Sequence, residues 1–181
     1  MQIIETERLI LRTWVESDAE AYFHINQDPK VYEFLLGPLS MQQVQDFIQK
    51  CNQEFKAQRF CLFAVETKDT HTMIGFIGLS EPNFESSFTP CVEVGWRLGS
   101  EHWGKGYATE GAKAVLAYGF HQIGLNEIVS FTATVNMRSR RVMEKIGMKR
   151  EPKEDFLHPK LAADHPISQH VLYRIQRKDF T

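Results

Sequence analysis

Hydrophobic and polar positions follow two spacings along the chain, and each spacing predicts a different element. Helical spacing predicts helices beginning after Ser17 and Ser40, and over 109–123 and 138–146. The polar run 67–70 predicts a hairpin turn, and 81–90 reads as a loop. Alternating or continuous apolar runs predict strands over 3–14, 60–66, 72–80, 91–98, 127–135, 148–154 and 168–176.

Capping residues support the helices. Ser17 with Glu20, and Ser40 with Gln43, have the spacing of a capping box, in which side chain and backbone bond each other reciprocally. Gly147 is placed to end the last helix. Behind Ser40, apolar residues form one helical stripe, which consists of Val44, Phe47, Ile48, Cys51 and Phe55.

The order of the elements predicts the fold class. The strand 91–98, the helix 109–123 and the strand 127–135 form a strand–helix–strand unit, which predicts a parallel crossover. The earlier strands are joined by short connections and are expected to be mostly antiparallel. We therefore expect an α+β fold with a mixed central sheet flanked by helices. With 181 residues and no linker, the chain is expected to be a single domain over 1–181.

Composition narrows the class of protein. The hydrophobic content of 43% and aromatic content of 12% are those of a globular domain. A net charge of −2 produces no electrostatic field that would attract nucleic acid or an anionic membrane, so neither is expected as a partner. Glu5, Glu7 and Arg8 make the N-terminus unlike a secretory signal, and three cysteines without C-x-x-C spacing suit reduced thiols. We expect a cytoplasmic monomer or homodimer.

The segment CVEVGWRLGSEHWGKGYAT (91–109) is the most informative stretch. It reads as a strand, a short loop with Gly104 and Gly106, and the start of a helix. A glycine loop that leads into a helix directs free backbone N–H groups and the positive end of the helix dipole at one point, so it can bind an anion. Alone, the pattern also suits an ordinary turn. It matches neither a P-loop nor a dinucleotide fingerprint.

A second motif decides between these readings. WGKGYATE is followed, about thirty residues later, by N-x-x-S-x-R-V-x-E-K-I-G-M, which starts at Asn136. Together the two motifs resemble the GCN5-related N-acetyltransferase (GNAT) superfamily, in particular the bacterial branch that acetylates ribosomal-protein N-termini. The segments ETERLILRTW, MIGFIGLS and HVLYRI extend the resemblance over nearly the whole chain. One departure is Trp103, where the superfamily usually has Gln or Arg.

The resemblance implies an acetyl-CoA-dependent N-acetyltransferase. No metal is expected, because His158 and His165 have no evident third ligand. It implies that the pyrophosphate lies on the loop backbone and the pantetheine arm along the strand before it. Gly95 would mark a bulge that opens the sheet, although a glycine there also suits ordinary packing. The expected cofactor-binding residues are Gly95, Trp96, Arg97, Leu98, Trp103, Gly104, Lys105, Gly106, Tyr107, Ala108, Thr109, Asn136 and Ser139.

Three residues are candidates for catalysis. Glu93 lies inside a strand, where Glu is depleted, so it is a candidate general base, acting through water; a solvated carboxylate or a partner of Arg97 is the alternative. The resemblance makes Ser139 the donor to the departing thiolate, although Ser139 and Asn136 also suit helix caps. Tyr173 is the rival general acid, with core packing as its alternative.

The acceptor is expected to be an α-amino group of a protein or peptide. Deprotonating an α-amino group at pH 7 costs about 1 kcal/mol, against roughly 4.6 kcal/mol for a lysine side chain, and one weak base suits the lower cost. Small-molecule amines of low pKa remain an alternative, as does a non-catalytic acetyl-CoA-binding module. The loop 155–166, with His158 and His165, is a candidate wall of the acceptor site.

Overall fold

The computed structural model describes all residues, 1–181. The short helix Pro29–Tyr32 (α2) and the short strand Phe156–Leu157 (β8) were not predicted from the sequence. The elements in chain order are β1 (Gln2–Glu5), β2 (Leu9–Arg12), α1 (Asp18–Gln27), α2 (Pro29–Tyr32), α3 (Met41–Gln58), β3 (Leu62–Thr67), β4 (Met73–Ser80), β5 (Glu93–Leu98), α4 (Tyr107–Tyr118), β6 (Glu127–Ala133), α5 (Met137–Lys145), β7 (Lys149–Arg150), β8 (Phe156–Leu157) and β9 (Gln169–Gln176).

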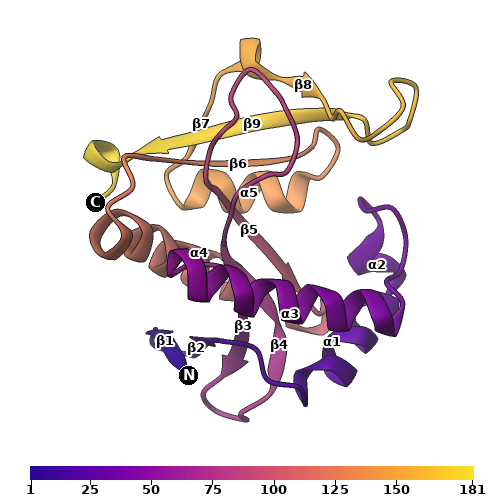
Figure 1. Ribbon diagram of the computed structural model, residues 1–181. Helices are drawn as coiled ribbons and strands as arrows, with labels where there is room; N and C mark the ends of the chain where they lie inside the picture. Colours follow the sequence, from indigo (N-terminus) through magenta and orange to yellow (C-terminus); the bar gives the residue numbers. More distant parts are fainter.

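One mixed sheet forms the centre of the molecule, in the order β1-β2-β3-β4-β5-β6-β9-β7, with β8 paired to β9 (Figure 1). All neighbours are antiparallel except β5 and β6, which are parallel and joined through α4. This confirms the predicted α+β fold with its crossover. None of the helices is both long enough and apolar enough to span a membrane.

Helices cover the two faces of the sheet, and neighbouring residues of β4 point to opposite sides. Phe76 packs edge-on against Tyr22 of α1 and tilted against Phe47 of α3. The next residue, Ile77, lies under Gly111 of α4, where a Cβ would come within 2.4 Å of the Ile77 side chain. Burial of these faces is the main stabilising term of the fold.

Helix α3 forms as its pattern predicts. Ser40 accepts a hydrogen bond from the backbone of Gln43, and the Gln43 side chain accepts one from the backbone of Ser40, so the capping box is complete. Of the predicted stripe, only Phe47 is not fully buried; the buried members are Val44, Ile48, Cys51 and Phe55. Helix α5 ends before Gly147, whose φ of +88° is left-handed.

Two predictions near the N-terminus were wrong. The strand expected over 3–14 is two antiparallel strands, β1 and β2, because Thr6 makes a turn in which its hydroxyl accepts a hydrogen bond from the backbone N–H of Leu9. Ser17 precedes α1 without a capping hydrogen bond. Its neighbour Asp18 accepts from the backbone of Val15 and pairs with Arg12 instead.

Candidate active site

The parallel strands β5 and β6 meet at one end and separate at the other. Glu93 and Val129 are their only paired positions. Beside this pair, the backbone N–H of Val129 donates to the carbonyl of Val92 over 2.9 Å, and the Ser130 hydroxyl donates to the carbonyl of Val94 over 2.8 Å. Figure 1 shows β5 running away from β6 beyond this point. The edge of β5 beyond Val94 is therefore free of β6.

A cleft of about 700 Å³ lies in the opening between β5 and β6. Gly95 pairs with Gly78 of β4 in unbroken register, so it makes no bulge, and the opening comes from the separation of β5 and β6. The predicted site residues that line the cleft are Glu93, Gly95, Trp96, Arg97, Leu98, Trp103, Gly104, Gly106, Tyr107, Ala108, Thr109, Asn136 and Ser139.

The glycine loop has the geometry expected of an anion cradle. Gly104 and Gly106 have φ of +73° and +86°, a left-handed conformation that favours glycine. Gly106 is the N-cap of α4 and brings no side chain to bond the first-turn N–H groups. These donors and the positive end of the α4 dipole lie at the cleft wall.

Arg8 and Glu110 hold this loop in place, and the sequence analysis assigned neither of them a role. Arg8 pairs with Glu110 at 2.6 Å, donates to the carbonyl of Lys105 at 2.9 Å, and lies 4.8 Å over the ring of Tyr107. Glu110 also accepts from the hydroxyl of Thr6 at 2.6 Å. The Lys105 side chain does not line the cleft; its carbonyl is the part that these contacts use.

Glu93 lies between two cavities. It is a lining residue of both the large cleft and a second cavity of about 280 Å³. Burial raises the pKa of Glu93 to about 8, and no hydrogen bond or ion pair to a neighbouring side chain opposes this shift. Arg97, the alternative partner, is instead bonded to Asn26 at 2.6 Å. Glu93 can therefore exchange a proton near neutral pH.

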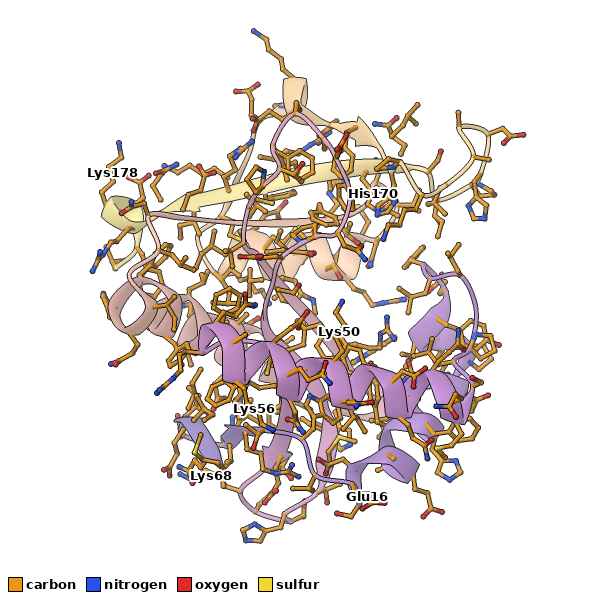
Figure 2. All side chains as sticks on the ribbon, viewed as in Figure 1. Glu16, Lys50, Lys56, Lys68, His170 and Lys178 are labelled. Atoms are coloured by element: carbon orange, nitrogen blue, oxygen red, sulfur yellow. The ribbon has the colours of Figure 1, made fainter.

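The second cavity is walled by α3, by the loop after β4, and by the region around His158. Figure 2 shows Lys50 on α3 in the lower part of the view and His170 on β9 in the upper part. The residues that line the second cavity include Phe47, Lys50, Cys51, Glu54, Glu81, Pro82, Asn83, Phe84, Phe131, His158 and Lys160. Because Glu93, Phe131, His158 and Lys160 also line the large cleft, the two cavities adjoin at Glu93.

Asn136 and Ser139 are helix caps and cleft residues at once. The side-chain oxygen of Asn136 accepts from the backbone N–H of Ser139 at 3.2 Å, which caps α5. The Asn136 amide nitrogen donates to the hydroxyls of Thr132 at 3.0 Å and Ser139 at 3.2 Å. Because the Ser139 oxygen acts there as an acceptor, its proton is available to an acceptor in the cleft.

Tyr173 is not brought together with Glu93 and Ser139. Its side chain is buried in β9, only 2% exposed, and its hydroxyl donates to Glu144 of α5 at 2.9 Å. It does not line the cleft. These contacts match the core-packing alternative for Tyr173.

Histidines stand at the junction of the two cavities. The rings of His158 and His170 are 4.9 Å apart, and both line the large cleft. Burial lowers the pKa of both side chains, which favours neutral imidazoles. His165 is exposed and lines neither cavity. His170, the second residue of β9, was not predicted as a site residue; the pairing of β9 with β6 and β8 brings it to the cleft.

Comparison with known proteins agrees with this arrangement. The profile of the acetyltransferase (GNAT) domain family matches residues 8–149. The uncharacterized N-acetyltransferase YoaA of Bacillus subtilis is 33% identical over 151 residues, which cover 82% of this chain and 84% of YoaA.

Solved structures share the fold. A GNAT-family acetyltransferase from Bacillus anthracis superposes with a TM-score of 0.77 at 28% identity, covering 97% of this chain and 98% of that one. RimJ of Mycobacterium smegmatis, solved in complex with CoA-disulfide, superposes with a TM-score of 0.74 at 20% identity, covering 94% and 82%. The chain therefore belongs to the GNAT family and is an acetyl-CoA-dependent N-acetyltransferase.

Proposed function

We propose that this enzyme acetylates the α-amino group of a peptide or protein N-terminus, with Glu93 as the general base. The observation that carries the proposal is the position of Glu93, which lines both cavities. Burial raises its pKa to about 8, which suits the role of base. The large cleft would hold acetyl-CoA, and the second cavity would admit the amine to the same carboxyl group.

The cleft suits acetyl-CoA in its shape and its donors. The uncapped N-terminus of α4 suits a pyrophosphate, and the free edge of β5 after Val94 offers backbone groups to an extended amide chain, as in strand addition. Acetyl-CoA supplies the activated acetyl thioester. The residues proposed to bind it line the cleft from Gly95 to Leu98, at Trp103 and Gly104, from Gly106 to Thr109, and at Asn136 and Ser139. Lys105 does not line the cleft and is proposed to contribute only its backbone.

Three steps are assigned to the side chains. Glu93 removes a proton from the acceptor ammonium, directly or through water, so that the nitrogen lone pair is free to attack the thioester carbonyl. A carbon–nitrogen bond forms and the carbon–sulfur bond breaks. Glu93 releases the first proton to water before it takes the second, which nitrogen loses on forming the amide. Ser139 donates a hydrogen bond to the departing sulfur, which then leaves as the thiolate, or donates its proton and regains one from water.

The raised pKa of Glu93 supports an α-amino group as the acceptor. A base with a pKa of about 8 takes a proton from an α-ammonium group of pKa about 7.7–8.0 at almost no cost. From a lysine side chain of pKa about 10.4 the same transfer costs roughly 3 kcal/mol. A small amine of low pKa is the second candidate acceptor, because the second cavity, about 280 Å³, has room for the end of an acceptor rather than for a long peptide.

Release of CoA from acetyl-CoA tests the proposal. The assay compares peptides with a free N-terminus, N-blocked peptides containing lysine, and a panel of small amines. We expect the free N-termini to react at least about tenfold faster than the blocked lysine peptides. Preference for the lysine peptides would overturn the α-amine assignment, preference for small amines would favour the second candidate, and no turnover with any amine would leave a binding module.

The same assay tests the base. Glu93→Gln should lower kcat/KM by about 10²-fold or more, the usual contribution of a general base. In a plot of kcat/KM against pH, the substitution should also remove the rise that has an apparent pKa near 8, which is the pKa to which burial raises Glu93. The acceptor's own titration is common to both enzymes and cancels in the comparison. An unchanged rate in Glu93→Gln would exclude Glu93 as the base.

A further inference from the structure

The positive charges of the cleft do not come from the glycine loop. Lys105, the loop's one basic residue, keeps its side chain outside the cleft. The basic side chains of α5 that line the cleft are Arg138, Arg141 and Lys145. Arg140, between them, turns away, bonds the carbonyl of Thr134 at 3.0 Å and does not line the cleft. Helix α5 therefore supplies three of the cleft's cationic side chains from one helix; Lys30, Arg97 and Lys160 line the cleft from other segments.

Arg138 joins three separate segments at the cleft. It comes from the first turn of α5, and its guanidinium lies 4.6 Å over the ring of Trp103, the residue before the glycine loop. It also lies 5.6 Å over the ring of Phe34, and it forms an ion pair with Glu33, both just after α2. Trp103 is itself fixed, because its ring N–H donates to the carbonyl of Leu98 at 2.9 Å.

The ion pair of Arg138 with Glu33 is more easily broken than its stack on Trp103. The side chains of Arg138 and Glu33 are 51% and 49% exposed, and an ion pair that is so exposed to water contributes little. The stack on Trp103 orients the guanidinium without using its in-plane N–H donors. A phosphate group bonds such a fork bidentately, and the phosphates of the cofactor together carry more charge than one carboxylate. The ion pair can thus be exchanged while the stack remains.

We propose that Arg138 is a ligand of the cofactor's phosphates, and that Glu33 holds its guanidinium over Trp103 until a phosphate displaces the Glu33 carboxylate. This rests on the proposed binding of acetyl-CoA in the cleft. Trp103 sets the position of the cation, α5 supplies the charge, and Glu33 competes with the ligand. Glu33 thereby lowers the affinity for the phosphate-bearing part of the cofactor and for no other part.

Calorimetry with two probes tests the proposal: acetyl-CoA, and acetyl-pantetheine, which has no phosphate. Arg138→Gln should weaken acetyl-CoA by about tenfold and acetyl-pantetheine by less than about twofold. Glu33→Gln should tighten acetyl-CoA by about two- to fivefold, and the double variant should bind like Arg138→Gln alone. Arg138→Lys should recover part of the affinity. Lys113→Gln on α4, exposed and outside the cleft, is the matched control and should bind like wild type.

The outcomes separate this inference from the function on which it rests. Wild-type protein that binds acetyl-CoA while Arg138→Gln binds it equally well would overturn the role of Arg138 alone. Equal losses for both probes, or a loss of acetyl-CoA affinity in Glu33→Gln, would make the pair a structural contact and overturn the competition. Wild-type protein that binds no acetyl-CoA would overturn the proposed function as well.

Discussion

The hydroxyl of Ser130 on β6 donates a hydrogen bond to the carbonyl of Val94 on β5 over 2.8 Å, at the last point where the two strands are joined. Ser130 is buried, with 2% of its surface exposed. In a regular parallel pair the next backbone N–H groups would continue the ladder. Here a side chain takes over the bond at the vertex, so the strands can separate without leaving the Val94 carbonyl unpaired.

Replacing Ser130 with Ala should therefore destabilise the protein. The Val94 carbonyl would be buried without its donor, which costs about 1–3 kcal/mol. Urea unfolding followed by circular dichroism measures the free energy of unfolding. Ser17→Ala is a suitable control because Ser17 is exposed and makes no capping hydrogen bond; it should change stability by less than about 0.5 kcal/mol. Equal effects of the two substitutions would contradict the role of Ser130 at the vertex.

The sequence predicts the parts of the fold that depend on nearby residues. The capping box at Ser40 and the stripe behind it lie within one helix, so their signal is complete in the sequence. The failure at Ser17 depends on Arg12, which lies six residues from Asp18 and 54 residues from its second partner, Glu66. Asp18 is held by Arg12, which also pairs with Glu66 of β3, and neither contact can be read from spacing near Ser17. The turn at Thr6 likewise depends on its bond to Glu110.

In the candidate site, too, features formed by neighbouring residues were predicted, and features formed by distant residues were not. The glycine loop and the cap at Asn136 were found because their residues are adjacent in the chain. Arg8 was missed because its partners lie 97 and 102 residues away, on the loop and on α4. Tyr173 has the right chemistry for an acid, but the register of β9 places it in the core beside Glu144 rather than in the cleft.

Gly106→Val should block binding of acetyl-CoA. Gly106 has a φ of +86°, which a β-branched residue rarely adopts, and an added Cβ would lie 3.3 Å from the Arg8 guanidinium that holds the loop. We expect the Kd measured by calorimetry to rise by about tenfold or more. Gly124 has the same φ of +86° and open space around it, and it follows the π-helical turn Gly119–Ile123 that continues α4. Gly124→Val therefore introduces the same backbone strain away from the glycine loop. Similar affinities in both variants would place the pyrophosphate elsewhere.

Ser139→Ala should lower kcat more than it weakens acetyl-CoA binding. A donor to the departing sulfur acts mainly in the transition state, so we expect kcat to fall by about tenfold or more and the Kd to change by less than about threefold. Tyr173→Phe is measured beside it. Because Tyr173 bonds Glu144 outside the cleft, its loss should leave kcat within about twofold and cost about 1 kcal/mol of stability. A large fall of kcat in Tyr173→Phe with little change in Ser139→Ala would make Tyr173 the general acid.

The raised pKa of Glu93 predicts how stability depends on pH. Burial raises the pKa from the ordinary value of 4.5 to about 8 in the folded protein. Between these values the folded state holds a proton that the unfolded state has lost, so stability must fall as the pH rises. The contribution is complete below pH 4.5 and is lost as the pH passes through about 8.

Glu93→Gln removes this titration while keeping the shape of the side chain. At pH 8.5 the variant should therefore be more stable than wild type by up to about 4–5 kcal/mol, and the difference should shrink toward pH 5, where wild-type Glu93 is protonated. Urea unfolding at pH 5, 7 and 8.5 measures the difference. Glu85→Gln removes an exposed carboxylate from the neighbouring loop and controls for net charge. Parallel pH dependences in wild type and Glu93→Gln would show that Glu93 ionises without penalty, and its suitability as a base for α-amines would be lost with that result.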